Sequence, residues 1–326
     1  MNFQNLEYFL VVAEELNITR AAEQLHISEQ ALSHHINKLE KELDTKLFYR
    51  SPRLTLTLGG KRLQAASREI RNIRHQLELE LDDINHSYSG ELRIGVSYTR
   101  GQAVLPALLP PFHAAHPRVV VALLEGSSQE LQAGLAKGMI DLLIEYAPIQ
   151  LETAEVVEIG KERMFLVVPR AFMDNKYGAN ADDMREKFRS GVDITEFSDM
   201  PFILLDKDDR VRRLVNRLFS HYGIRPRVWL ETKNIQTAFA LSMKGMGVTV
   251  YPELFLSSSS TLSLLNTPGS QPPVDCFPIQ SEFTTQTIVI AYDKDKYLSN
   301  AASEFISEAR KSLQSGILNS EKNDLV

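Results

Sequence analysis

Apolar residues recur at helical spacing along the N-terminal part of the chain. The most regular stretch repeats them every three or four residues, at Leu32, Ile36, Leu39 and Leu43. This spacing predicts a helix that turns one face towards a core, and Ser28 stands where a hydroxyl can cap its first turn. Similar spacing predicts a helix over about 5–15 and then a second one that Asn17 or Thr19 can cap.

The second and third of these helices are separated by only a few residues. Ala21 and Ala22 are small enough to let the two helices cross closely, so the pattern predicts a helix-turn-helix. The face of the third helix opposite its apolar stripe carries polar or cationic side chains at Gln30, Ser33, His34, Asn37, Lys38 and Lys41. Such groups suit base edges and phosphates, although an ordinary amphipathic helical hairpin would show the same pattern.

A short two-stranded wing is predicted after the third helix. Residues 48–50 are followed by Arg53 and by the alternating run Leu54-Thr-Leu-Thr-Leu. The residues that match a known pattern are Phe9, Ala21, Ala22, Leu25, Ser28, Ala31, Leu32, Ser33, Ile36, Leu39, Glu40, Leu47, Phe48, Arg50, Thr57 and Gly60. In these residues and their spacing the chain resembles the LysR-type transcriptional regulators, which bind double-stranded DNA.

The resemblance implies an all-α winged helix-turn-helix domain over residues 1–58. We expect DNA to be bound by Ser28, Gln30, Ser33, His34, Asn37, Lys38, Arg50 and Arg53. The polar face of the third helix, at Gln30, Ser33, His34 and Asn37, is expected to lie in the major groove, and the two arginines to reach phosphates from the wing.

The chain departs from the family's pattern at two sites. Glu29 and Gln30 stand where the family often has Gln-Pro, so its base preference does not transfer. Asp44 replaces the usual helix-ending glycine, where left-handed geometry costs a non-glycine residue roughly 1 kcal/mol or more. Neither departure changes the predicted fold.

A long helix is predicted from about Leu58 to Asn85. Apolar residues fall seven apart along it, with two more at interleaved positions, at Leu63, Ile70, Leu77, Ile84, Ala66 and Ile73. This heptad pattern predicts a seam that needs a partner. We expect the partner to be the same helix of a second subunit, so that 59–88 forms a linker and dimerisation helix, as the resemblance also implies. The alternative is packing against the next domain.

From residue 89 the periodicity changes to alternating strands and helices. Strands are predicted at 92–96, 119–124, 141–144, 163–169, 202–205, 228–230, 245–252 and 287–292, and helices at 103–114, 129–137, 210–221, 235–243 and 302–313. The β-α-β-α-β order at its start implies a parallel sheet with right-handed crossovers.

Short pieces spread over this region match the same family, at Leu92–Gly95, His116-Pro117, Glu125-Gly126, Leu135, Gly138, Asp141, Val168-Pro169 and Gly245–Pro252. The region therefore resembles the family's effector-binding domain, a two-lobed α/β fold of the type 2 periplasmic-binding-protein kind. The resemblance implies an effector domain over 89–315, with lobe one at about 90–162 and 281–315 and lobe two at about 163–280.

Three segments fall outside this resemblance. Residues 174–198 are longer and more charged than the family's usual loop and fit an extra helix at about 182–189. The serine run at 257–260 is expected to be a flexible loop, and residues 316–326 a disordered tail.

Two polar corners follow strands of the predicted sheet. Ser97, Tyr98 and Thr99 come after its first strand, and Ser127 and Ser128 after its second. Ligands bind at the carboxyl ends of parallel strands, where helix N-termini present N–H groups that suit a carboxylate or another small anion. These hydroxyls would equally well only cap their own helices. The resemblance favours an effector in the cleft between the lobes, and the other wall of that cleft is expected to include Tyr146, Phe202 and Thr249.

The net charge of −6 over 326 residues is unusual for a chain that binds nucleic acid, but its basic residues are clustered. Between Lys46 and Arg74 there are eight basic residues and one acidic residue, which gives a local charge of +7. Such a segment beside the helix-turn-helix would supply the phosphate contacts that dominate affinity. The alternative is a solvated basic helix face.

The sequence offers little for catalysis or for metal binding. His34 and His35 are adjacent and so point to different faces of a helix, and no Cys or carboxylate pattern accompanies His113 and His116. The single cysteine, Cys276, has no nucleophile motif around it and fits a reducing compartment. We therefore expect no enzyme activity, no cofactor and no metal.

The first residues lack a basic segment followed by an apolar run, and no apolar stretch approaches membrane-spanning length. We expect a cytoplasmic homodimer or homotetramer whose partners are DNA and a small-molecule effector, with no membrane contact. Two other classes of protein fit the sequence less well. A solute-binding protein would need an export signal and no helix-turn-helix, and an enzyme with an added DNA-binding domain would need a catalytic constellation.

Overall fold

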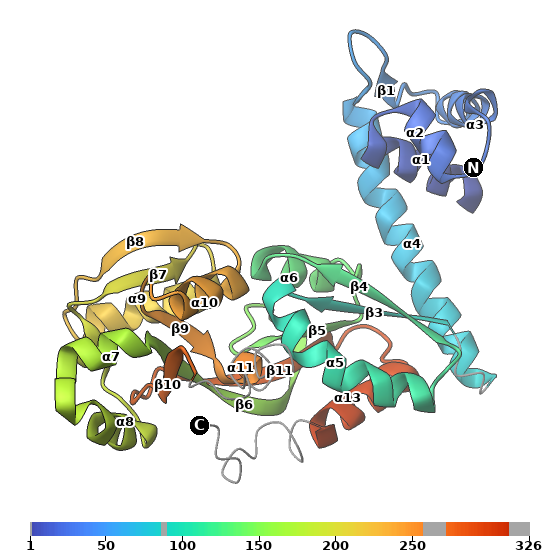
Figure 1. Cartoon of the computed structure of the whole chain (residues 1–326). Coiled ribbons are helices and arrows are strands. Elements are labelled where there is room, and N and C mark those ends of the chain that lie inside the picture. Colours follow the sequence, from blue (N-terminus) through green and yellow to red (C-terminus); the bar gives the residue numbers. More distant parts are fainter. Residues whose placement is uncertain (1, 86–89, 257–271, 313–326) are drawn as a thin grey trace. The chain divides into compact units, whose positions relative to one another are not determined.

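The computed structural model describes residues 2–85, 90–256 and 272–312 (Figure 1). The chain divides into two compact units, residues 1–85 and 86–326. Among the described helices, none combines the length and the apolar character needed to cross a membrane.

The N-terminal unit is a winged helix-turn-helix followed by a long helix, as predicted. Its elements are α1 Phe3–Glu15, α2 Ile18–Gln24, α3 Glu29–Glu42, β1 Phe48–Tyr49, β2 Thr55–Leu56 and α4 Leu58–Ile84. Asn17, rather than Thr19, caps α2, and Ser28 caps α3 by accepting a hydrogen bond from Ala31 N. Ala21 and Ala22 are buried where α2 meets α1 and α3, which confirms the close crossing.

The third helix ends earlier than its apolar repeat suggested. Leu32, Ile36 and Leu39 are buried in the core of the unit, but the helix stops at Glu42 and Leu43 is exposed at its C-cap. The prediction that Leu43 faces the core was wrong, because the chain turns away there. Asp44 has a φ of 46°, so it does occupy the left-handed position that a glycine would favour.

The heptad seam of α4 is divided between two environments. Leu63 packs against the core of the winged unit, so it belongs to that core rather than to a seam. Further along, Ile73, Leu77 and Ile84 are 69%, 53% and 70% exposed. Leu81, which the heptad count omitted, lies on the same stripe and is also exposed.

The C-terminal unit begins with three parallel strands. β3 Gly90–Val96 lies between β4 Val119–Glu125 and β5 Leu142–Tyr146, and the connections are α5 Tyr98–Ala115 and α6 Ser128–Ala136. β11 Thr285–Asp293 pairs antiparallel with β5, and α13 Asn300–Ser312 packs on α5 through an edge-on contact between Phe112 and Phe305. We call these elements lobe one.

The remaining elements form lobe two, and β6 Ala154–Pro169 runs through both (Figure 1). The strands of lobe two are β7 Pro201–Leu205, β8 Arg227–Thr232, β9 Thr249–Pro252 and β10 Val274–Pro278. Its helices are α7 Arg170–Tyr177, α8 Ala181–Arg189, α9 Arg210–His221 and α10 Ile235–Met243, with the short 3-10 turns Gly178–Asn180 and Ile194–Phe197. The short helix α11 Glu253–Leu256 follows β9 directly.

The expectation of a parallel sheet holds for β3, β4 and β5 and for the pair β7 and β8. It was wrong for β6 and β9, which pair antiparallel. β11 also pairs antiparallel, as does β10, which was not predicted as a strand. The physical reason is that β6 follows β5 without a crossover helix and is long enough to receive β11 along one part and β9 and β10 along another. The sheet is therefore mixed.

The charged segment 174–198 contains the extra helix that was predicted, as α8. Arg185 attaches it to lobe two by donating hydrogen bonds to Asp275 (2.9 Å), Asp174 (2.5 Å) and Asp182 (2.7 Å). The predicted flexible loop at 257–260 and the predicted tail at 316–326 lie outside the described residues.

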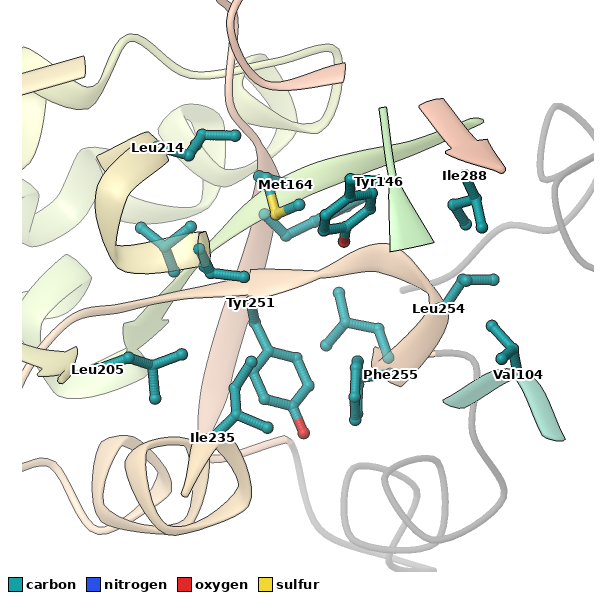
Figure 2. Close-up of a cluster of buried hydrophobic side chains, with 14 of the residues drawn as sticks. Val104, Tyr146, Met164, Leu205, Leu214, Ile235, Tyr251, Leu254, Phe255 and Ile288 are labelled. Carbon is teal, nitrogen blue, oxygen red and sulfur yellow. The ribbon is translucent and has the colours of Figure 1, made fainter. Parts of the chain in front are cut away.

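One buried apolar cluster extends through the C-terminal unit. Figure 2 shows Val104 and Ile288 from lobe one, Leu214 and Ile235 from lobe two, and Met164 from β6 within it. Tyr251, Leu254 and Phe255, from β9 and α11, add to the same cluster. Because both lobes contribute to it, apolar burial stabilises their junction.

Candidate functional site

The exposed face of α3 carries most of the residues predicted to bind DNA. Gln30, His34, Asn37 and Lys38 are exposed, while Ser33 is half-buried. Burial of Leu32, Ile36 and Leu39 on the opposite face fixes the orientation of the helix. Ser28 is exposed, but its hydroxyl already accepts from Ala31 N, so it serves the helix as a cap. The arrangement presents short polar groups on a fixed helix, as base reading in a major groove requires.

The wing is attached to α3 by a buried carboxylate. Glu40 accepts hydrogen bonds from Leu47 N (2.8 Å), Phe48 N (3.3 Å) and Lys46 Nζ (2.9 Å). Burial alone would raise the pKa of Glu40, but these three donors outweigh it and lower that pKa from its usual 4.5. Glu40 matches the family's pattern in the sequence, but no role was predicted for it. An acidic residue directly after Leu39, beside the apolar stripe, was the available signal.

The two wing arginines have different surroundings. Arg50 follows β1 and donates a hydrogen bond to Asn37 Oδ1 on α3 at 2.6 Å. Its guanidinium thus lies against Asn37, a residue predicted to face the bases, and the phosphate contact of Arg50 stays a prediction. Arg53 is exposed at the tip of the wing, where a phosphate contact is open to it.

Part of the basic segment is already paired within the N-terminal unit. Lys46 pairs with Glu40, Arg68 with Glu14 at 3.3 Å, and Arg74 with Glu78 at 2.7 Å. The cations that remain exposed at the start of α4 are Lys61 and Arg62. The positive charge available to phosphates is therefore smaller than the count along the sequence indicated.

The two serine corners of lobe one are helix caps. Ser97 accepts from Arg100 N at 3.4 Å and caps α5. Ser127 caps α6 in a capping box, and both its backbone N and its hydroxyl donate to the Glu130 carboxylate, at 2.9 and 2.8 Å. Because a carboxylate already occupies these donors, the corner at Ser127 is unsuited to an anion. Ser128 accepts from the side chain of Gln132.

The residues predicted for the opposite wall lie inside the protein. Phe202 is fully buried against Phe219, and Thr249 is buried in β9 opposite Val167. Thr99 is half-buried and Tyr98 is exposed at the N-terminus of α5. Of the predicted set, the structure thus brings Ser97, Tyr98 and Thr99 together and places Phe202 and Thr249 in the core of lobe two.

Tyr146 belongs to a buried polar cluster rather than to a surface. Its hydroxyl donates to Glu162, whose carboxylate also accepts from Arg100 Nη1 at 3.2 Å. The guanidinium of Arg100 lies over the Tyr146 ring, 3.4 Å from its centroid. Burial raises the pKa of Tyr146, so its hydroxyl remains a donor.

A second arginine connects the lobes. Arg210, at the N-terminus of α9 in lobe two, donates to Glu145 Oε1 (3.0 Å) and to Ala147 O (2.7 Å) at the end of β5 in lobe one. Gln236 on α10 donates to Gln102 on α5 at 3.0 Å. Neither contact was predicted from the sequence, since local spacing says nothing about residues 65 or 134 positions apart.

Two family models match the chain. The model described as the bacterial regulatory helix-turn-helix protein, lysR family, matches residues 3–61. The model described as the LysR substrate binding domain matches residues 85–314. The first match lies in the N-terminal unit, and the second covers most of the C-terminal unit.

Curated relatives are similar over most of the chain. The HTH-type transcriptional regulator YcgK of Bacillus subtilis is 31% identical over 96% of this chain and 95% of its own. The HTH-type transcriptional activator IlvY of Salmonella typhimurium is 29% identical over 79% of this chain and 85% of its own.

Solved structures share the fold. Full-length CbnR in complex with its target DNA superposes with a TM-score of 0.67 at 23% identity, over 96% of this chain and 100% of that one. Full-length OxyR from Pseudomonas aeruginosa gives a TM-score of 0.68 at 22% identity, over 97% of this chain and 95% of that one. The fold class predicted from the sequence is thereby confirmed.

Proposed function

The chain belongs to the LysR family of bacterial helix-turn-helix transcriptional regulators, and on that premise we propose that a small anion bound in its C-terminal unit controls how it holds promoter DNA. It is a DNA-binding regulator with a substrate-binding effector domain, and not an enzyme. The observation that carries the DNA-binding part is α3, whose polar face is exposed while Leu32, Ile36 and Leu39 hold its other face in the core.

On DNA, α3 lies in the major groove with Gln30, His34 and Asn37 towards the base edges, beside Ser33 and Lys38. Arg53 at the wing tip contacts a phosphate. A salt titration of the full chain on selected and on random DNA tests these roles. Arg53→Ala should weaken binding to all sequences and flatten the salt slope by about one unit. Gln30→Ala should relax preference at one base pair by roughly 1–3 kcal/mol. Equal losses on both DNAs for each variant would refute the assignment.

Two subunits pair through α4. The exposed stripe of Ile73, Leu77, Leu81 and Ile84 supports this, because four apolar side chains in one row on a helix favour burial by a second helix. β4 is an edge strand of its sheet and carries the exposed apolar residues Val120 and Leu123, which supports a second contact, along this edge, between C-terminal units in a tetramer. As a regulator of promoters, the protein acts in the cytoplasm.

The anion binds at the lobe junction, near the N-terminus of α5 and within reach of Arg210. Two observations support this position. Ser97 and Thr99 stand at a helix N-terminus, which favours negative charge. The side chain of Arg210 is 25% exposed, and its carboxylate partner Glu145 belongs to the other lobe. An incoming anion can therefore compete with Glu145 for the guanidinium of Arg210.

Calorimetry with a panel of small carboxylates and inorganic anions tests this position. Thr99→Val keeps the shape but removes a donor, and about tenfold more effector should be needed for the same response. Ser127→Ala is the matched control, because its hydroxyl is held by Glu130 and its loss should leave the affinity unchanged. An unchanged affinity for Thr99→Val, or an equal loss for both variants, would place the effector elsewhere.

A further inference from the structure

The wing touches the recognition helix through one exposed hydrogen bond, from Arg50 Nη2 to Asn37 Oδ1. At 2.6 Å it is short, and its donor is charged, so it belongs to the stronger class of hydrogen bonds. Asn37 is one of the side chains expected to face the bases. A contact that fixes the orientation of its amide therefore bears on which base it reads.

Both ends of this hydrogen bond are attached to the same rigid part of the N-terminal unit. Asn37 lies on α3 one turn before Glu40, which accepts from Leu47 N and Phe48 N and so ties β1 to the helix. Phe48 is buried against Phe9, with ring centroids 5.4 Å apart. Arg50 lies two residues after Phe48, directly after the end of β1. Because the backbone of the wing is fixed to α3, it positions the guanidinium of Arg50 beside Asn37.

The chemistry of an amide makes this contact informative. An asparagine reads adenine by donating from Nδ2 to N7 and accepting from N6 at Oδ1. Arg50 takes one of the two lone pairs of Oδ1 with a charged donor and leaves both protons of Nδ2 free. A second donor at Oδ1, such as adenine N6, would lie beside the guanidinium, so the amide faces the groove chiefly as a donor. Guanine offers two acceptors and no donor in the major groove, at N7 and O6, and it is the base that this donor suits best.

We infer that Arg50 is a specificity-determining residue that acts through Asn37, holding the amide as a donor so that guanine is preferred to adenine at the base pair it contacts. The inference rests on the proposed placement of α3 in the major groove. Exclusion of water on DNA binding strengthens the Arg50–Asn37 contact, since a charge-assisted hydrogen bond gains as the local dielectric falls.

Selection of bound sequences from random DNA by the full chain tests the inference without a known operator. Asn37→Ala identifies the contacted base pair as the position where preference is lost. Arg50→Met should lower the guanine-over-adenine preference there by about tenfold and leave other positions unchanged. In the Asn37→Ala background the same Arg50→Met change should have no further effect on preference. Arg50→Lys retains a charged donor and should keep the preference.

Arg53→Met is the matched control, a wing arginine whose loss should weaken binding evenly. The inference is overturned if Arg50→Met behaves like Arg53→Met, if its effect on preference persists without Asn37, or if Asn37→Ala alters no position. Failure of the proposed function looks different, because the unmodified chain would then select no sequence at all. Thermal unfolding of each variant, unchanged from the parent, excludes loss of fold as the cause.

Discussion

Glu40 illustrates how a single side chain holds the wing against α3, the helix that we propose to read DNA. A carboxylate buried without partners would carry a large desolvation penalty and would take up a proton. Here three donors from the wing meet it, and their hydrogen bonds keep its pKa below the ordinary value despite burial. Glu40 therefore stays ionised only while the wing is folded against it, and the ionised carboxylate in turn stabilises the folded wing.

This coupling predicts a pH-dependent loss of stability in the Glu40→Gln variant. A depressed pKa contributes stability that is fully present above the unfolded value near 4.5 and is lost as pH falls through the folded value. The variant should therefore unfold more easily at pH 7, by about 1–3 kcal/mol, with the difference shrinking below pH 4. Denaturant unfolding of the full chain across this range measures it.

The control for this measurement is Glu23→Gln, an exposed carboxylate on α2. It should leave the unfolding free energy nearly unchanged at every pH. A Glu40→Gln difference that stays constant from pH 7 to pH 3.5 would show that the amide geometry, and not the charge, supplies the effect.

At the scale of the element, the apolar residues of α4 lie in two different environments, although their spacing predicted a single seam. Its first turns pack on the winged unit through Leu63, while its later turns expose an apolar stripe. The exposed residues continue the helical period as Ile73, Leu77, Leu81 and Ile84. A helix whose apolar stripe faces water over several turns is poorly stable without a partner.

Leu77→Asp is therefore expected to separate the subunits. A carboxylate forced into a dry helix pair would be buried without a partner, and dissociation avoids that penalty. Sedimentation of the full chain should show the mass halved, and DNA affinity should fall because two half-sites are no longer bound together. Leu58→Asp, the same change at an exposed position at the start of α4, should leave the mass unchanged. If Leu77→Asp also leaves mass and affinity intact, the stripe is not the dimer contact.

At the scale of the whole molecule, the contacts between the lobes of the C-terminal unit define how a ligand can act. Arg210 links α9 to the end of β5, and Gln236 links α10 to α5. A ligand shifts such an equilibrium only by its differential affinity for the closed and open arrangements. An anion that takes Arg210 from Glu145 changes that balance directly.

We expect Arg210→Met to favour separation of the lobes. The measurement uses Gln102→Cys and Gln236→Cys in the full chain and the rate at which a short bis-maleimide joins them. The natural thiol Cys276, which is only partly buried, is replaced by serine in all of these proteins, so that only the two introduced thiols react. Arg210→Met should slow the cross-link several-fold, because the charged bridge beside it is lost.

Arg213→Met provides the comparison, since Arg213 is an exposed arginine of the same helix that bonds Asp208 O within lobe two. Its cross-linking rate should equal that of the parent. Equal rates for all three proteins would mean that the apolar cluster alone holds the lobes together.

Much of the architecture followed from the sequence, for a physical reason. Helix periods, capping residues and alternating strands record interactions between residues close in the chain, so α1 and the parallel strands of lobe one were predicted nearly at their bounds, and capping residues indicated where α2 and α3 begin. The exposed face of α3 was fixed in the same way, because burying Leu32, Ile36 and Leu39 leaves the polar positions outside.

Only the tertiary structure decided which side chains meet. Arg50 and Asn37 are 13 positions apart, Leu47 and Glu40 seven, and Arg210 and Glu145 65. Each pair joins two different elements, and the periodicity within one element carries no information about such contacts. The antiparallel course of β6, and the burial of Phe202 and Thr249, likewise depend on which strand lies beside which. The secondary structure of a segment depends largely on its own residues, whereas the contacts between its side chains and other segments depend on how the segments pack. Both candidate sites consist of such contacts.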